Sequence, residues 1–215
     1  MSGPKPSAAV LAQAEQLGVS RESWARVETF VALLLQWQER INLISPASIA
    51  SVWERHVIDS LQLLPLIPPG AKVFADLGSG SGFPALPLAI VSGLKVHLYE
   101  SNNKKAAFLR EALRVTAASG EIHAERLTGK APVQGYPKVN LVTARALAPL
   151  HELLGYAYPF TETGAQALFM KGQDVDQELT VAAKYWRIQS TKHASLTDSQ
   201  AIILAVQEVT PCLAS

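Results

Sequence analysis

The sequence predicts an α/β protein with a mostly parallel, seven-stranded sheet, helices on both faces and a helical extension at the N-terminus. Three observations lead to this prediction. From residue 72 onward, short apolar runs typical of strands alternate with longer stretches of helical periodicity. A glycine-rich turn directly follows the first of these runs. Residues 8–64 show only helical patterns.

The N-terminal extension precedes the first expected strand. Four helices are expected in it, over residues 8–18, 21–40, 46–55 and 57–64. Ser20 is suited to cap the second helix, because a serine hydroxyl accepts a hydrogen bond from an early backbone amide. The run Pro68-Pro69-Gly70 marks a boundary. We therefore expect residues 1–68 to form a tail and helical extension packed on a domain of residues 69–215.

The alternating part of the chain defines the sheet. Strands are expected over residues 72–76, 95–100, 121–126, 139–144, 165–171, 186–192 and 201–207. Helices are expected at about 84–92, 103–118, 149–158 and 174–184. Such alternation predicts parallel strands with right-handed crossovers and helices on both faces.

Residues 73–84, which read VFADLGSGSGFP, contain the turn that points to a ligand. Glycines at positions 78, 80 and 82 leave the backbone bare, so a ligand can approach it closely. A dinucleotide fingerprint needs a glycine at the sixth position, where this chain has Phe83. With Asp76 two residues before Gly78, the spacing fits S-adenosylmethionine better than NAD, and Gly78, Ser79 and Gly80 are expected to bind it. A tight turn without a ligand is the alternative.

A second acid lies where a nucleoside ligand requires one. Glu100 ends the apolar run of the second strand, 20 residues after Gly80. An acid at this distance holds the ribose hydroxyls in doubly wound sheets. We expect Glu100 to accept from the ribose diol, and Asp76 to orient the turn or face the ammonium group of the methionine end.

Composition excludes several classes of protein. The 48% apolar content suffices for a core, and no apolar run approaches the ~20 residues of a membrane span. The single cysteine, Cys212, excludes a disulfide framework and suits a reducing cytoplasm. Five scattered histidines show no metal-binding spacing, so no metal is expected. The first ten residues lack a signal-peptide core. We expect a cytoplasmic monomer.

The net charge of +1 gives little support for nucleic-acid binding, so local patches must supply it. Basic residues expected near the carboxyl edge of the sheet are Arg55, His56, Lys104, Lys105, Arg145 and Lys171. Cations from several segments at one edge would position phosphates. The alternative for the lysines and arginines of the helix at 103–118 is an ordinary solvated face.

The methyl acceptor is narrowed by what the sequence lacks. A cysteine nucleophile for pyrimidine C5 is absent from the expected site, because Cys212 lies almost at the C-terminus. The Asn/Asp-Pro-Pro-aromatic loop used for adenine amines is replaced by residues 143–147, TARAL. Guanine N7 needs neither, since its lone pair is nucleophilic and carries no proton. Orientation then suffices, and no general base is expected.

These residues together resemble the RsmG (GidB) family of bacterial 16S ribosomal RNA guanine-N7 methyltransferases. The likeness covers about Asn42 to Leu204. It is carried by the segments Asn42-Leu43, Arg55-His56-x-x-Asp59-Ser60-Leu61, Asp76 to Pro84, Lys104-Lys105-x-x-Phe108-Leu109, Ala144-Arg145-Ala146 and Lys171-Gly172. The resemblance implies a Rossmann-like class I methyltransferase fold and methylation of one guanosine in the decoding-region loop of 16S rRNA, free or in the 30S subunit.

The resemblance also implies roles for individual positions. Gly78 and Phe83 would line the cofactor, Arg126 and Leu127 would flank the adenine, and Arg145 would close the site. The chain departs from the family pattern at Ala85, where glycine is usual, at 125–127, and at 199–201, where an arginine is common. Three alternatives remain: another acceptor, a nicotinamide-dependent oxidoreductase, or a non-catalytic cofactor sensor or ribosome-binding module.

Overall fold

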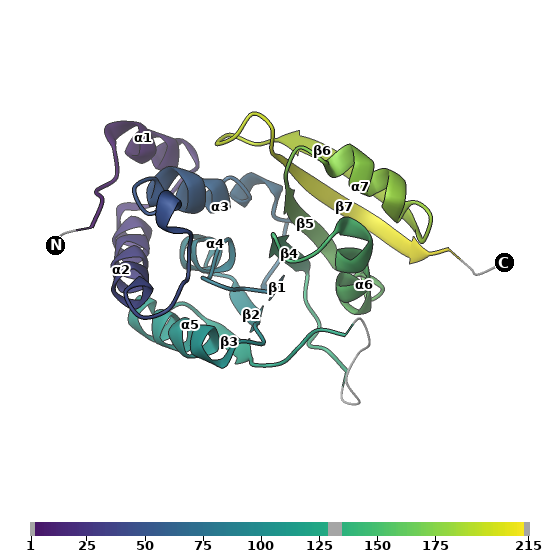
Figure 1. Cartoon of the computed structure of the whole chain (residues 1–215), viewed down its shortest axis with the longest axis horizontal. Helices are drawn as coiled ribbons and strands as arrows, with labels where there is room; N and C mark the ends of the chain where they lie inside the picture. Colours follow the sequence, from purple (N-terminus) through teal and green to yellow (C-terminus); the bar gives the residue numbers. More distant parts are fainter. Residues whose placement is uncertain (1–2, 129–134, 213–215) are drawn as a thin grey trace.

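The computed structural model describes residues 3–128 and 135–212. Its seven strands form one sheet in the order β3-β2-β1-β4-β5-β7-β6 (Figure 1). They are β1 (Val73–Leu77), β2 (Lys95–Tyr99), β3 (Gly120–His123), β4 (Leu141–Arg145), β5 (Gln166–Lys171), β6 (Trp186–Ala194) and β7 (Ile202–Pro211). Strands β1 to β5 pair in parallel, whereas β7 is antiparallel to both β5 and β6. The mostly parallel seven-stranded sheet is confirmed.

Helices cover both faces of the sheet, as expected (Figure 1). They are α1 (Ala8–Gln16), α2 (Arg21–Gln38), α3 (Asp59–Leu61), α4 (Ala85–Ser92), α5 (Asn103–Thr116), α6 (Leu150–Thr161) and α7 (Val175–Ala182). Helices α1 to α5 share a core with one face, where Phe30 contacts Phe83 and Phe108. Helices α6 and α7 cover the other face. The N-terminal helices are thus packed on the sheet through fully buried side chains.

The expected third and fourth helices are wrong in their boundaries. Pro46–Ser48 forms a single 3₁₀ turn (η1), because the Ser45 side chain bonds the Ser48 hydroxyl instead of capping a backbone amide. The chain becomes helical again at Trp53–Ile58 (η2), which is π-helical and continues directly into α3. A 3₁₀ turn at Leu64–Leu66 (η3) follows. Wide π turns are frequent at functional sites, and this one carries His56 toward the glycine turn.

The start of α2 and the end of β3 can also be compared with the sequence predictions. The Ser20 hydroxyl accepts from the backbone amide of Ser23 at 3.1 Å, which confirms the predicted N-cap. Strand β3 ends at His123, earlier than predicted, and so leaves residues 124–128 as a loop. Parallel strands expose their carboxyl ends at one edge, and the loops after β1 to β4 meet there. Within the described residues, no helix is both long and apolar enough to cross a membrane.

Candidate functional site

The glycine turn follows β1 and has a backbone that other residues resist. Gly78, Gly80 and Gly82 have φ angles of 69°, 54° and 84°, in the left-handed region that favours glycine. A Cβ on Gly78 would lie 2.5 Å from Leu147 Cδ1. The turn therefore packs its bare backbone at Gly78 against Leu147 of the loop after β4, a contact that the spacing did not predict.

Glu100 fixes this turn to the end of β2. Its Oε2 accepts a hydrogen bond from the Gly80 amide at 2.8 Å, and its Oε1 accepts one from the Asn102 amide at 2.7 Å. The side chain is buried but lines a pocket. A carboxylate offers about four acceptor positions, so two backbone amides leave capacity for a ligand hydroxyl. Glu100 thus serves both as an anchor of the turn and as an acceptor facing the pocket.

Asp76 lies beneath the turn and does not line the pocket. It is fully buried, and its Oδ1 accepts from the Thr143 hydroxyl of β4 at 2.6 Å. Burial raises the pKa of this carboxyl to about 6, although the hydroxyls of Thr143 and Ser79 and the charge of Arg145 act in the opposite direction. Of its two expected roles, this placement favours orienting the turn.

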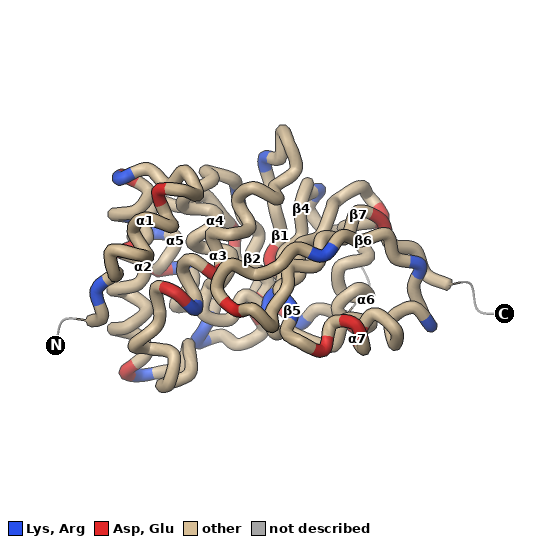
Figure 2. Tube along the Cα trace, turned by 90° about the horizontal axis from the view of Figure 1, so that it is seen from above, with Lys and Arg blue, Asp and Glu red and all other residues tan. Residues whose placement is uncertain are grey.

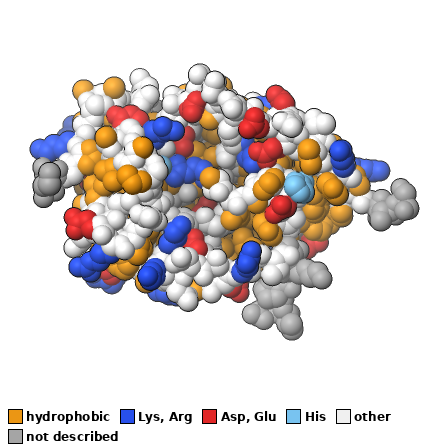
Figure 3. Space-filling view, viewed as in Figure 1, with side chains coloured by type: hydrophobic (Ala, Val, Ile, Leu, Met, Phe, Trp, Pro, Cys, Tyr) orange, Lys and Arg blue, Asp and Glu red, His pale blue; other side chains and the backbone are white. Residues whose placement is uncertain are grey.

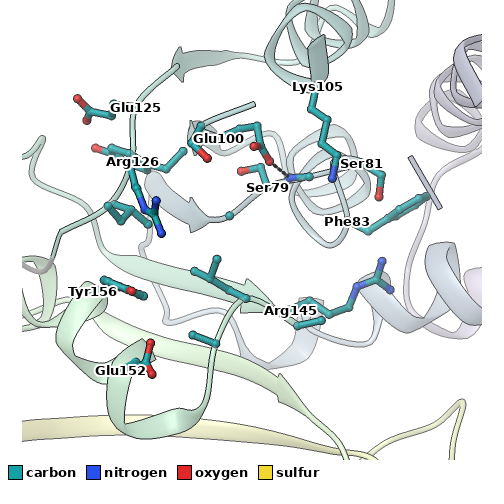
Figure 4. Close-up of a pocket in the computed structure, with 18 of the residues that line it drawn as sticks. Ser79, Ser81, Phe83, Glu100, Lys105, Glu125, Arg126, Arg145, Glu152 and Tyr156 are labelled. Atoms are coloured by element: carbon teal, nitrogen blue, oxygen red, sulfur yellow. Dashed lines mark hydrogen bonds between the residues drawn. The ribbon is translucent and has the colours of Figure 1, made fainter. Parts of the chain in front are cut away.

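The pocket has a volume of about 720 Å³ and opens at the carboxyl edge of the sheet (Figure 4). This lies within the usual range for small-molecule sites. The residues of the sequence prediction that line it are Gly78, Ser79, Gly80, Phe83, Glu100, Lys105, Arg126, Leu127 and Arg145. Figure 4 shows Arg126 and Phe83 at opposite ends of the cavity, with Glu100 between them. The structure therefore brings one cluster together from four separate loops.

Several lining residues were missed by the sequence reasoning. They are Leu43, Ser81, Tyr99, Ser101, Glu125, Glu152, Tyr156 and the loop 146–149. The loop was detectable, because it follows a strand at the edge where ligands bind. Glu152 and Tyr156 are spaced as neighbours on one face of α6, but the same spacing occurs on any helix face. Only the packing of α6 shows that this face meets the pocket.

Arg145, at the end of β4, joins the pocket to the N-terminal extension. Its Nη1 donates to Asp59 Oδ2 and to the Arg55 carbonyl oxygen, each at 3.3 Å, and its Nη2 donates to His56 Nδ1 at 3.0 Å. Its guanidinium carbon lies 5.4 Å from the centre of the Phe83 ring. Burial lowers the pKa of Arg145, and Asp59 opposes this. The guanidinium is held in one orientation at the pocket wall.

His56 supports Arg145 rather than presenting a charge. Its ring stacks on Phe83 with centroids 5.0 Å apart, and its Nε2 bonds the Ser48 hydroxyl at 2.9 Å. Burial and the charge of Arg145 lower the pKa of His56 to about 4. The ring is therefore neutral at pH 7, so a phosphate contact through an imidazolium, as the sequence suggested, does not fit this environment.

The other predicted basic residues fall into different surroundings. Lys171 is largely buried, and its Nζ contacts Glu178 Oε2 at 2.6 Å and donates to the Ala148 carbonyl oxygen at 3.3 Å. Its charge is thus neutralised inside the protein. Arg55 is exposed on the neighbouring surface. Adjacent lysines on α5 diverge, with Lys105 in the pocket and Lys104 outside it.

One group of side chains outside the pocket has ligand atoms close enough to suit a metal ion. His97, Glu121 and His123, on β2 and β3, place theirs within 4.8 Å of one another. His97 Nδ1 and His123 Nε2 are 2.9 Å apart, and Glu121 pairs with Lys95. These contacts already satisfy the groups, so we assign no ion to them. The expected absence of a metal stays a prediction.

Comparisons with known proteins identify the family of this chain. Residues 23–204 match the family model described as rRNA small subunit methyltransferase G. A relative of that name from Bradyrhizobium sp. (strain ORS 278) is 50% identical over 192 residues, covering 87% of this chain and 86% of the relative. One from Paramagnetospirillum magneticum is 46% identical, covering 89% and 92%.

Solved structures of lower identity share the fold. A ribosomal protein L11 methylase from Lactobacillus delbrueckii subsp. bulgaricus aligns with a TM-score of 0.55 and 18% identity, covering 71% of this chain and 77% of that one. An O-methyltransferase from Bacillus cereus, in complex with SAH, aligns with a TM-score of 0.54 and 14% identity, covering 84% and 91%. The Rossmann-like methyltransferase fold is thereby confirmed.

Proposed function

The chain belongs to the rRNA small subunit methyltransferase G family, and on that premise we propose that it methylates N7 of one guanosine in the decoding-region loop of 16S rRNA, with S-adenosylmethionine as donor. The observation that carries the proposal is the bare turn at residues 78–82, which lines the pocket and is held by the hydrogen bond from the Gly80 amide to Glu100. The nicotinamide alternative is disfavoured by Phe83 at the position of the third glycine.

The residues present fit S-adenosylmethionine. The backbone of Gly78, Ser79 and Gly80 lines the pocket, and a Cβ on Gly80 would meet only the Gly78 carbonyl oxygen, at 3.7 Å, so this part of the turn is open to a ligand. Glu100 would accept from the ribose hydroxyls with the acceptor capacity that its two amide bonds leave. Arg126 and Leu127 would flank the adenine from the loop after β3. Asp76 lies below the turn, where it would hold the turn in place and its negative charge would attract the cationic ligand.

The chemistry calls for orientation more than for proton transfer. When bound, S-adenosylmethionine would supply an electrophilic methyl on a sulfonium sulfur, whose carbon–sulfur bond would break as the carbon–N7 bond forms. Because N7 carries no proton in guanine, we propose no general base, although Glu125 and Glu152 line the pocket. Arg145, fixed by Asp59 and His56, would close the site and orient the acceptor beside Phe83.

The proposal extends to partners. Arg55 and Lys104 are exposed and would contact the RNA, whereas His56 and Lys171 would act by holding other residues in place. We also propose, as expected from the sequence, that the protein acts as a monomer. Its place would be the cytoplasm, with free 16S rRNA or the 30S subunit as acceptor.

Transfer of labelled methyl groups tests the proposal. Purified protein, labelled S-adenosylmethionine and 30S particles lacking the modification should give label in 16S rRNA, at N7 of a single guanosine when the base is mapped. Particles that already carry the modification are the matched control and should remain unlabelled. Label only in protein or in a small molecule, or no label under turnover conditions, would contradict the proposal.

A further inference from the structure

A groove between α2 and α5 lies next to the pocket but outside it. Its volume is about 860 Å³, and its apolar floor includes Leu33, Trp37 and Ile41 from the α2 side and Ala107 from α5. Trp37 is half-buried, with its ring 5.8 Å from that of Phe108. The groove thus offers an apolar floor with part of an indole exposed.

The rim of this groove is strongly basic. Arg40, Lys104, Arg110 and Arg114 line it together with one acid, Glu111. Arg114 pairs with Glu111 at 2.7 Å. Within residues 3–128 and 135–212, the side chains of Arg40, Lys104 and Arg110 have no hydrogen bond or ion pair. Three uncompensated cations are therefore concentrated in one groove of a chain whose net charge is +1. Figure 3 shows Lys and Arg side chains gathered over α5.

The groove lies beside the cofactor pocket, with neighbouring residues lining one or the other. Lys104 lines the groove and its neighbour Lys105 lines the pocket, so the first turn of α5 separates the two. On the other side, Ile41 lines the groove and Leu43 lines the pocket. Along α5, the cations from Lys104 to Arg114 extend over about 15 Å, at a rise of ~1.5 Å per residue. A strand leaving the pocket at this point would pass along a row of positive charges.

We propose that this groove binds the sugar–phosphate backbone of the rRNA strand next to the target guanosine; the inference rests on the proposed function. Repeating phosphates match cations spaced along one helix. The indole of Trp37 suits contact with a base or ribose, since aromatic surfaces bind single-stranded nucleic acid without sequence preference. Phosphate contacts of this kind position the RNA, whereas the pocket selects the base.

The test compares two variants of equal charge change. Arg40→Gln/Arg110→Gln removes two cations from the groove. Lys184→Gln/Arg187→Gln removes two exposed cations near the C-terminal end of β7, where Arg187 pairs with Thr210. Figure 2 shows Lys and Arg residues near the C-terminus, far from α2 and α5. Binding of the 16S rRNA fragment that contains the target loop is measured by filter binding from 0.05 to 0.2 M KCl. Loss of two phosphate contacts should lower the slope of log affinity against log salt by about 1.4 and weaken binding about tenfold at 0.15 M.

The methylation assay separates this inference from the proposed function. The groove variant should raise KM for RNA about tenfold while kcat at saturating RNA and affinity for S-adenosylmethionine stay at wild-type values. The control variant should match the wild type throughout. If the wild type methylates 16S rRNA and the groove variant keeps its KM and salt slope, the groove proposal is wrong and the function stands. A groove variant that keeps its RNA binding but loses affinity for acidic ribosomal proteins would also overturn the groove proposal.

Discussion

The buried carboxyl of Asp76 gives a prediction that tests the electrostatics of the site. Asp76→Asn replaces it with a neutral group of the same shape, whose oxygen still accepts from Thr143. The pKa of Asp76 is raised from 3.8 to about 6 by burial. At about 1.4 kcal/mol per unit, ionised Asp76 lowers the free energy of unfolding by about 3 kcal/mol. The asparagine variant should therefore be more stable at pH 7.5 by about 2–3 kcal/mol.

The difference in stability between the variant and the wild type depends on pH within a defined window. Between pH 3.8 and about 6 the folded protein retains the Asp76 proton while the unfolded chain has lost it, so stability of the wild type falls as pH rises. The variant lacks this group. Its gain should be absent below pH 4 and complete above pH 6. The pKa of His56, lowered to about 4, acts equally in both proteins and cancels in the difference.

Urea unfolding, followed by tryptophan fluorescence at pH 4, 5, 6 and 7.5, measures this difference in stability. Cofactor is left out because its binding adds stability. A variant less stable than wild type at pH 7.5, or a gain equal at pH 4 and 7.5, would refute a raised pKa. We also expect the variant to bind S-adenosylmethionine more weakly, because the buried charge of Asp76 attracts the cationic ligand. A stability cost retained for function is common in binding sites.

Three further predictions, each based on substitutions, test the remaining assignments. Gly78→Ala should abolish detectable S-adenosylmethionine binding by calorimetry. The control Gly93→Ala is also at positive φ but has nothing within 4 Å of its Cβ, so it should only lose about 1–2 kcal/mol of stability. Equal cofactor binding by both variants would contradict the role of the turn. Arg145→Ala should lower kcat at least tenfold and stability by about 2 kcal/mol, measured by methylation and urea unfolding, since it leaves the partly buried carboxylate of Asp59 without its cationic partner. Unchanged kcat would exclude Arg145 from the site. Lys104→Glu should reduce RNA methylation with cofactor affinity nearly unchanged, while Lys105→Glu should reduce cofactor affinity; the reverse pattern would mean that the two lysines are misassigned.

Spacing along the chain predicted the parts of the site that depend on backbone conformation. Gly78, Gly80 and Gly82 take the positive φ angles that their pattern implied. Glu100 lines the pocket directly after β2, where an acid 20 residues beyond Gly80 was expected, although its hydrogen bond to the Gly80 amide was not. These features are predictable because strand, turn and strand ends follow from local residue types and from the geometry of a parallel sheet.

Side-chain partners from distant segments were not predictable in the same way. His56 and Lys171 look like free cations in the sequence. In the structure, His56 accepts from Arg145, 89 positions away, and Lys171 pairs with Glu178 across a strand-to-helix connection. Pairing of this kind depends on how elements pack, which residue spacing does not specify.

The sequence by itself determined the glycine turn, the acid at the end of the second strand, the order of strands and helices along the chain, and through its resemblance the family. Only the tertiary structure decided which basic residues remain available for RNA. It buried Asp76 under the turn, enclosed His56 and Lys171, and divided Lys104 from Lys105 between groove and pocket. The physical reason is that backbone conformation responds to local sequence, whereas charge and solvent exposure are set by neighbours that only folding brings together.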